Sequence, residues 1–287
     1  STSMMAEYKT DHDDHMKLDR LPQIVVERIL SYLTWEEKLT MCLDLMPAWT
    51  EYLYSSNTWS HLIIDKIDYD DSIASPCAET SYIPLYEVIK SYGIYMQHVS
   101  LVLTSKTFHK VGLSILRLLS QTCVNIKSVS LRHSDYFEFN NFGQLQEYVD
   151  ILGSLSRSGI CHLNLYNLNY NIFDRDQGIP ELLSILLNSS AAKAIYRLDY
   201  KHNYDLGKPV NEVAFFVNMR ELKCPLQCLN TEILLKLLNN TCIQDLGIRN
   251  DGSTLNEEYE ECMKINWTFV SKEAGRLHTE NNRRLLN

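Results

Sequence analysis

Glycine and proline are scarce in this sequence, which has 10 glycines and 7 prolines among 287 residues. The scarcity excludes collagen-like and low-complexity architectures and leaves little material for tight β-hairpins, so we expect many helices. Positive charge is also in deficit, because 27 Lys and Arg face 36 Asp and Glu, for a formal charge of −9. A duplex-binding protein needs surplus cations to displace counterions, which argues against nucleic acid as the main ligand.

Long hydrophobic runs are missing too. No stretch approaches a membrane span of about 18 uncharged apolar residues, and the amino terminus lacks the apolar segment of a secretory signal. The eight cysteines are scattered, unlike the dense disulfide framework of a short secreted domain. We therefore expect reduced thiols in a soluble protein of the cytoplasm, the nucleus or both, with no membrane partner. At 45% hydrophobic residues, the chain can bury a large core.

An amphipathic helical segment begins near Leu18. Apolar side chains recur at nearly helical spacing over 21–33, and Pro22 suits the first helical turn. Thr34, with acidic residues after it, predicts the cap of a second helix, and Pro47 predicts a break before a third. Because about 40 residues make a small core, we expect this segment to pack on a partner.

Residues 18–62 contain a Leu-Pro pair, then an Ile-Leu-x-Tyr-Leu run, then two tryptophans. In the order and spacing of these elements the segment resembles an F-box, the helical module that docks on the S-phase-kinase-associated (Skp) adaptor. Met46 departs from the family, which often has Cys there. Alternatively, these side chains form the core of a small helical cap on the next domain. By the resemblance, the adaptor-binding residues are Leu21, Pro22, Ile24, Ile29, Leu30, Leu33, Leu39, Trp49 and Trp59.

A six-residue pattern, apolar-x-x-apolar-x-apolar, recurs after residue 95 and alternates with helical stretches. The alternation predicts stacked strand–helix units. It is similar to the ribonuclease-inhibitor-like arc of F-box proteins with degenerate leucine-rich repeats, although the usual Asn is poorly kept, with Asn167 and Asn250 as candidates. An ordinary α/β domain with a parallel sheet is the alternative. The six instances begin at Met96, Ile126, Ile160, Ile195, Met219 and Ile243.

The predicted fold is therefore α/β, a three-helix F-box followed by a leucine-rich-repeat solenoid. We expect a disordered tail or expression remnant at 1–17, the F-box at 18–62, a linker and capping helix at 63–95, and about six to seven repeats at 96–287. The carboxyl end offers no obvious polar cap, which favours a truncated array.

Polar side chains alternate with the buried ones along each predicted strand and should line the concave surface. Five of them are basic and three acidic, so the surface suits an acidic or phosphorylated segment of a protein substrate. Tyr166 is the expected anchor, because aromatic and Arg side chains dominate binding energies. The predicted substrate-binding residues are Arg132, Tyr166, Arg197, Lys201, Lys223 and Arg249.

Catalytic motifs are absent: the sequence has no P-loop, no G-x-G-x-x-G after a strand, no G-x-S-x-G and no H-E-x-x-H. Cys42 and Asp44 form the Cys-x-Asp pair of some pathogen ubiquitin ligases, but we expect Cys42 to be buried and inert. Cys224 and Cys228 find no second pair for a four-thiolate zinc site. We therefore predict a protein that is not an enzyme and has no metal and no cofactor.

These expectations combine into the substrate-recognition subunit of a Skp-cullin-F-box ubiquitin ligase. By the resemblance, the F-box binds the Skp adaptor and through it a cullin-RING ligase, so that ubiquitin transfer follows from proximity alone. A leucine-rich-repeat scaffold or interaction protein without a ligase is the alternative, and a microbial effector that subverts a ligase would share the same mechanism.

Overall fold

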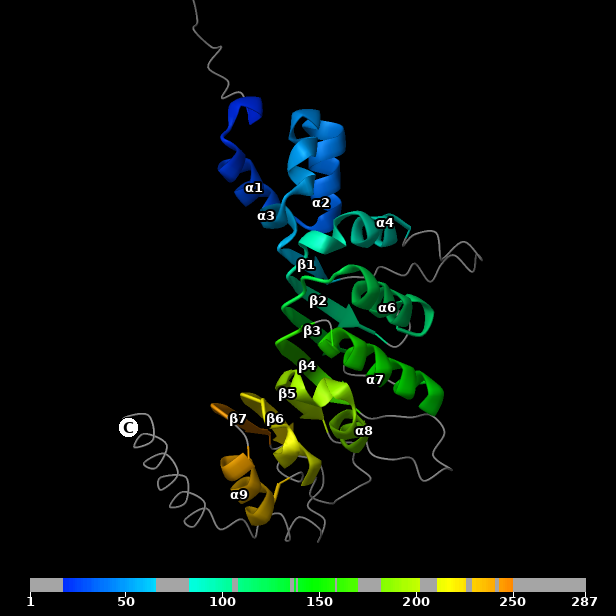
Figure 1. Ribbon diagram of the computed structural model, residues 1–287, viewed down its shortest axis with the longest axis vertical. Helices are drawn as coiled ribbons and strands as arrows, with labels where there is room; N and C mark the ends of the chain where they lie inside the picture. Colours follow the sequence, from blue (N-terminus) through cyan, green and yellow to red (C-terminus); the bar gives the residue numbers. More distant parts are fainter. Residues whose placement is uncertain are drawn as a thin grey trace, which may run out of the picture.

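One sheet of seven parallel strands extends from below the amino-terminal helices toward the opposite end of the molecule (Figure 1). The computed structural model describes residues 18–65, 83–104, 108–134, 137, 139–157, 159–169, 182–201, 211–225, 229–240 and 243–249. The strands follow one another in chain order, and β1 and β7 are the two edges, so the described sheet is open. The strands are β1 (His61–Ile64), β2 (His98–Leu103), β3 (Ser128–His133), β4 (His162–Asn169), β5 (Ile195–Lys201), β6 (Glu221–Pro225) and β7 (Asp245–Arg249).

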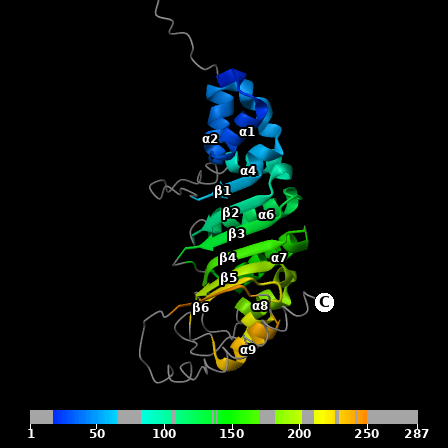
Figure 2. The ribbon, with the colours of Figure 1, turned by 90° about the vertical axis from the view of Figure 1, so that its left-hand side faces the viewer.

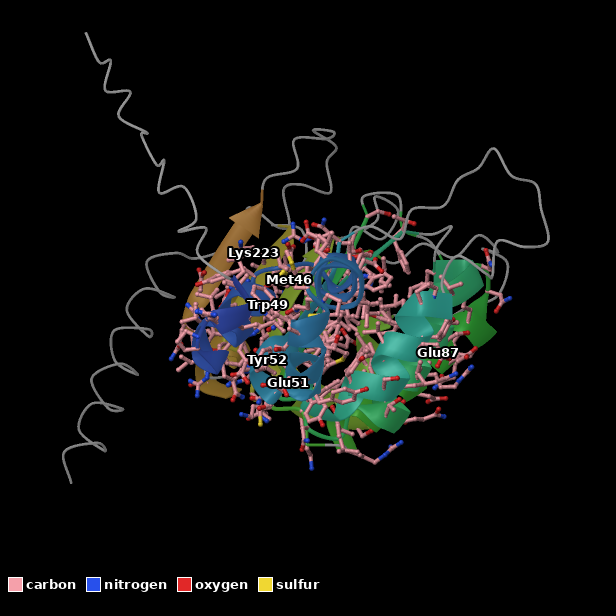
Figure 3. All side chains as sticks on the ribbon, turned by 90° about the horizontal axis from the view of Figure 1, so that it is seen from above. Met46, Trp49, Glu51, Tyr52, Glu87 and Lys223 are labelled. Atoms are coloured by element: carbon pink, nitrogen blue, oxygen red, sulfur yellow. The ribbon has the colours of Figure 1, made fainter. Side chains whose placement is uncertain are left out.

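Helices between successive strands lie on one face of this sheet (Figures 1 and 2). Seen along the stack, Glu87 lies on the helical side and Lys223 on the side of the sheet (Figure 3). In the part of the chain that the structure describes, no helix is both long enough and apolar enough to cross a membrane. The α-helices of this layer are α4 (Ile83–Tyr92), α6 (Leu113–Thr122), α7 (Phe142–Arg157), α8 (Leu182–Asn188) and α9 (Thr231–Asn240). Shorter helical turns are η5 (Gly93–Tyr95), η6 (Phe108–Gly112), η7 (Ser190–Lys193) and η8 (Asn211–Phe215).

Alternating burial explains the strands. In β2 every second residue is buried against the helices, and the intervening ones are half-exposed. The parallel register sets Leu101 beside Leu131, and Leu131 beside Leu165, so each buried layer continues across the sheet. The resulting hydrophobic cluster is continuous from Val26 in the amino-terminal helices to Leu237 in α9.

The amino-terminal helices follow local signals in the sequence. Thr34 caps α2 in a capping box: the Glu37 backbone N–H donates to the Thr34 hydroxyl (3.2 Å), and the Thr34 N–H donates to the Glu37 carboxylate (2.8 Å). A new helical segment starts at Pro47, as predicted. The elements are η1 (Leu18–Arg20), α1 (Gln23–Ser31), α2 (Trp35–Leu39), η2 (Thr40–Leu45), η3 (Pro47–Tyr54) and α3 (Ser56–Trp59).

The prediction of a three-helix F-box followed by a leucine-rich-repeat solenoid is corrected here. The structure is an α/β fold with a single seven-stranded parallel sheet, which was the alternative reading of the strand–helix alternation. Helices α1 to α3 share the sheet's hydrophobic cluster, and β1 directly follows them within that sheet. The six pattern instances fall at β2 to β7 because any strand with one buried face shows this pattern, whether or not it belongs to a repeat array.

Trp59 joins the amino-terminal helices to the helical layer. Its fully buried ring stacks on Tyr92 of α4, with centroids 4.9 Å apart and planes inclined by 12°. The indole N–H donates to the Leu53 carbonyl oxygen at 2.7 Å. Lys38 of α2 places its ammonium nitrogen 4.9 Å from the Trp59 ring centroid, a cation–π contact. Three elements thus meet on one aromatic ring.

Replacing Lys38 by methionine is expected to stabilise the protein at neutral pH. Burial lowers the pKa of Lys38 from 10.5 to about 8, so holding it charged in the folded state costs about 3 kcal/mol. The cation–π contact offsets about 1 kcal/mol, and methionine keeps the apolar packing. Urea unfolding at pH 7 should therefore show a gain of about 2 kcal/mol for Lys38→Met, with the exposed Lys90→Met as the control.

The pH dependence of the two proteins gives an independent check. Because the folded-state pKa of Lys38 is depressed, the unfolded chain binds more protons between about pH 8 and pH 10.5, and wild-type stability rises with pH in that window. Lys38→Met should lack that rise. Equal slopes in the two proteins would contradict a buried, charged Lys38.

Candidate functional site

The face of the sheet that no helix of the described residues covers, here called the open face, carries polar side chains. Along β3 it presents Ser128, Ser130 and Arg132, and along β4 His162, Asn164 and Tyr166. All six are half-buried or exposed. The residues between them are buried, namely Val129, Leu131, Leu163 and Leu165. Parallel pairing brings them into rows across the sheet, with Arg132 beside Tyr166.

Two arginines flank Tyr166 on the open face. Arg132 on β3 lies with its Cζ atom 5.3 Å from the Tyr166 ring centroid, and Arg197 on β5 with its Cζ atom 5.0 Å away. Arg197 also donates to the Tyr166 hydroxyl at 2.5 Å. These three residues, the Arg–Tyr–Arg cluster, place two guanidinium groups beside one amphipathic ring on three adjacent strands.

The backbone around Tyr166 is fixed by a bulge and by a buried histidine. Asn167 has φ 53°, a left-handed conformation that Asn tolerates well, and the β4–β5 register shifts between Leu165 and Leu168. The His133 ring lies 2.9 Å, by its Nδ1, from the Tyr166 carbonyl oxygen, and 3.0 Å, by its Nε2, from the Tyr148 hydroxyl. A carbonyl only accepts, so Nδ1 carries the proton and Nε2 accepts from Tyr148.

Acidic side chains adjoin the cluster. Arg197 forms an ion pair with Glu221 of β6, and both side chains are mostly buried. Arg132 is exposed and has no carboxylate partner among the described residues. Among the described residues, Arg132 is therefore the arginine of this pair without a carboxylate partner, whereas Arg197 pairs with Glu221.

The other predicted residues of this face are not gathered at the cluster. Lys223 is exposed on β6 and lies over β7, where a Cβ on Gly247 would come within 2.9 Å of the lysine Cγ. The side chains of Lys201 and Arg249 lie outside the described residues. Among its described side chains, the open face has as many basic as acidic residues, so its positive charge is concentrated at the cluster. The basic residues are Arg132, Arg197 and Lys223, and the acidic ones are Asp199, Glu221 and Asp245.

The residues predicted for the adaptor divide by exposure. The largest apolar ones pack inside this chain, so their burial needs no second protein. Leu30, Trp49 and Trp59 are buried, Leu21, Ile29, Leu33 and Leu39 are partly buried against the same core, and Pro22 and Ile24 are exposed. Helical spacing identified apolar positions correctly but not what covers them.

Sequence reasoning missed a row of histidines at the amino ends of the strands. His61, His98 and His162 come from β1, β2 and β4, and Ser128 of β3 completes the row. The His61 and His98 rings stack with centroids 4.7 Å apart, and His98 Nδ1 lies 2.8 Å from the Ser128 hydroxyl. Its signal was a histidine at the first position of three strands, but the contacts between the rings depend on the register of those strands.

The thiols match their expected chemistry where the structure describes them. Cys42 is fully buried, and burial raises the pKa of its thiol to about 11, so it is a poor nucleophile. Cys42, Cys123 and Cys161 are free thiols, whereas Cys228 lies outside the described residues. No group of three or more His, Cys, Asp or Glu in the described ranges could hold a metal ion.

Two shallow hollows lie away from the cluster. One, of about 350 Å³, opens between α7 and α8 on the helical side and includes Phe142 and Ile185. The other, of about 390 Å³, lies at the amino ends of β2 and β3 and includes Gln97 and Lys127. Neither hollow includes a residue of the Arg–Tyr–Arg cluster.

Comparison with known proteins gives only distant structural likenesses. No protein-family model matches the sequence, and no curated protein matches it. A sugar phosphate isomerase/epimerase from Parabacteroides distasonis is 10% identical, with a TM-score of 0.28 over 81% of this chain and 92% of that one. The tropomodulin C-terminal domain from Caenorhabditis elegans is 14% identical, with a TM-score of 0.27 over 70% of this chain and 95% of that one. Likenesses this low assign neither a family nor an activity.

The identification as an F-box protein with leucine-rich repeats is therefore corrected, and with it the ubiquitin-ligase function and the leucine-rich-repeat scaffold alternative. No family model supports it, and the fold is a single parallel α/β sheet. The expectation that the chain is not an enzyme is also withdrawn, because the lack of a few known catalytic motifs does not exclude an activity.

Proposed function

We propose that the open face binds a phosphorylated segment of another protein, with a phosphate on the Arg–Tyr–Arg cluster. The observation that carries the proposal is the pair of guanidinium groups on either side of Tyr166. Arginine presents its N–H groups in a planar fork that matches phosphate oxygens, and the flat Tyr166 ring holds both forks in place. The ring also offers apolar area for the segment itself.

The ion pair within the site favours phosphate over a carboxylate. Arg197 already pairs with Glu221, so an incoming anion must compete with a carboxylate that is present permanently. A phosphate brings a charge of about −1.5 to −2 and three acceptor oxygens, which a Glu or Asp side chain cannot match. It can bridge Arg132 and Arg197, whereas a second carboxylate would mainly meet the repulsion of Glu221.

Loss of either arginine should weaken phosphopeptide binding. We expect Arg132→Ala and Arg197→Ala each to lower the affinity of a fluorescein-labelled phosphoserine peptide about tenfold or more, since each removes charge-assisted hydrogen bonds. Glu221→Gln should have the opposite effect, because it frees Arg197 from its internal carboxylate. Fluorescence anisotropy with the full chain measures all three, and Lys90→Gln on the helical side is the matched charge control.

Each alternative has its own outcome. If the cluster only braces the sheet, Glu221→Gln will not tighten binding, and the proposal fails. Equal affinity for the phosphoserine peptide, its glutamate version and its serine version would likewise overturn it. Circular dichroism of every variant separates lost binding from lost folding.

We also propose that the protein works in a reducing compartment, the cytoplasm or the nucleus. The free thiols of the described residues support this, because the exposed Cys161 would be prone to oxidation elsewhere. Fractionation of cells that express the tagged protein tests it.

A further inference from the structure

The histidine row and the Arg–Tyr–Arg cluster lie on the same face at a fixed separation. Ser128 and Arg132 are four residues apart on β3, and His162 and Tyr166 are four apart on β4. At about 3.3 Å per residue, the two groups are about 13 Å apart along the strands. Ser130 and Asn164 lie between them, uncharged and hydrogen-bonded to each other at 3.0 Å. The face thus carries two separate sites for charge.

The histidine row brings three imidazole rings to one end of the open face. Its members occupy one register position on β1 to β4. The His61 ring stacks on the His98 ring, whereas the His162 ring contacts Tyr196 of β5, with centroids 4.3 Å apart. Lys127, just before β3, adds a permanent charge and donates to the Gln97 side chain at 2.7 Å. The carboxylates of the open face stand on strands further along, Asp199 on β5, Glu221 on β6 and Asp245 on β7.

We propose that the open face recognises an extended segment with two phosphates four residues apart, the first on the Arg–Tyr–Arg cluster and the second on the histidine row. In an extended chain, side chains four residues apart point to the same side and are separated by about 13 Å, which matches the two groups. This inference rests on the proposed function, since the first phosphate must bind at the cluster.

Proton uptake should accompany the second contact. The pKa of His98 is lowered by burial first, and then by the charges of His61, Lys127 and His162, so His98 is mostly neutral at neutral pH. A phosphate beside the row favours the charged imidazole and reverses that shift. Binding of the second phosphate therefore gains strength as the pH falls toward the pKa of histidine.

The experiment compares peptides that differ only in phosphate number and spacing. Labelled peptides with one phosphoserine, with two spaced by four residues and with two spaced by three are titrated into the full chain at about pH 6.5 and pH 8. We expect the second phosphate at spacing four to tighten binding about fivefold at the lower pH and about twofold at the higher one, where His98 is less protonated. At spacing three it should add little, because the second side chain points away from the face.

Variants then assign the gain to the row. A chain with both His98→Gln and His162→Gln should lose the pH dependence of the gain, whereas Lys90→Gln should keep it. The gain is the ratio of doubly to singly phosphorylated affinity at the same pH, so titration of the first phosphate largely cancels.

The outcomes separate the two proposals. Absence of binding by the singly phosphorylated peptide sinks the proposed function and this inference with it. Binding of that peptide without a spacing-dependent gain overturns the inference alone. An equal gain at spacings three and four, or a gain that survives the double histidine variant, also overturns it.

Discussion

Replacement of Trp59 by alanine is expected to lower the free energy of unfolding by about 3–5 kcal/mol, as for other large aromatic side chains removed from a core. Trp59 is fully buried, stacks on Tyr92 and donates to the Leu53 carbonyl oxygen. Alanine leaves a cavity where α2, α3 and α4 meet. It also leaves the Leu53 carbonyl oxygen without its hydrogen-bond donor and exposes the Lys38 side chain. Urea denaturation at neutral pH gives the difference.

Two further variants make the result specific. Trp59→Phe keeps an aromatic ring against Tyr92 and should lose less stability than alanine. Tyr32→Ala removes an aromatic side chain that is 72% exposed and should change stability by no more than about 0.5 kcal/mol. An equally small change in unfolding free energy for Trp59→Ala and Tyr32→Ala would contradict the packing of Trp59 between the amino-terminal helices and α4.

Local signals were readable from the sequence because they depend on neighbours along the chain. The cap at Thr34 and the helix start at Pro47 are set by a hydroxyl and a ring within one helical turn, and both are found as predicted. Strand positions were readable for the same reason, since one buried face imposes alternation. The strand β1, His61–Ile64, was missed because four residues give too short a pattern.

What covers an apolar side chain was not readable. Helical spacing marks Trp49, Trp59 and Leu30 as apolar, but the same spacing suits a core within the chain or a surface for a partner. The structure buries all three in the chain itself. The resemblance to an F-box therefore led from correct helices to an unsupported function.

The candidate site was readable only in part. Alternation predicted that Arg132, Tyr166 and Arg197 share a face, but their contact depends on the register of three strands and on the bulge at Asn167. Register is a tertiary property, set by packing of the buried layers rather than by any one strand. The contacts within the histidine row depend on the same register, and His61 was missed together with β1.

Acid should destabilise the protein through His133, the residue that ties Tyr166 to the core. His133 is fully buried, and burial lowers its pKa from 6.5 to about 4, despite the opposing effect of its hydrogen bond to the Tyr166 carbonyl. The unfolded chain therefore binds a proton between about pH 6.5 and pH 4 that the folded chain does not, so this contribution to stability falls as the pH drops through that window. At pH 5 the loss from this residue is about 2 kcal/mol, and toward pH 4 it approaches about 3 kcal/mol.

The comparison that isolates this effect uses the slope of stability against pH. His133→Gln removes the titrating group, so its unfolding free energy should fall less between pH 7.5 and pH 5 than that of the wild type, by about 2 kcal/mol. The variant itself should be about 1–3 kcal/mol less stable at pH 7.5, because one of the two hydrogen bonds to Tyr148 and Tyr166 is lost. Val124→Ala, at an exposed residue that does not titrate, should keep the wild-type slope. Equal slopes for wild type and His133→Gln would mean that His133 takes up its proton in the folded state. The Tyr166 backbone would then not be held by a buried neutral imidazole ring.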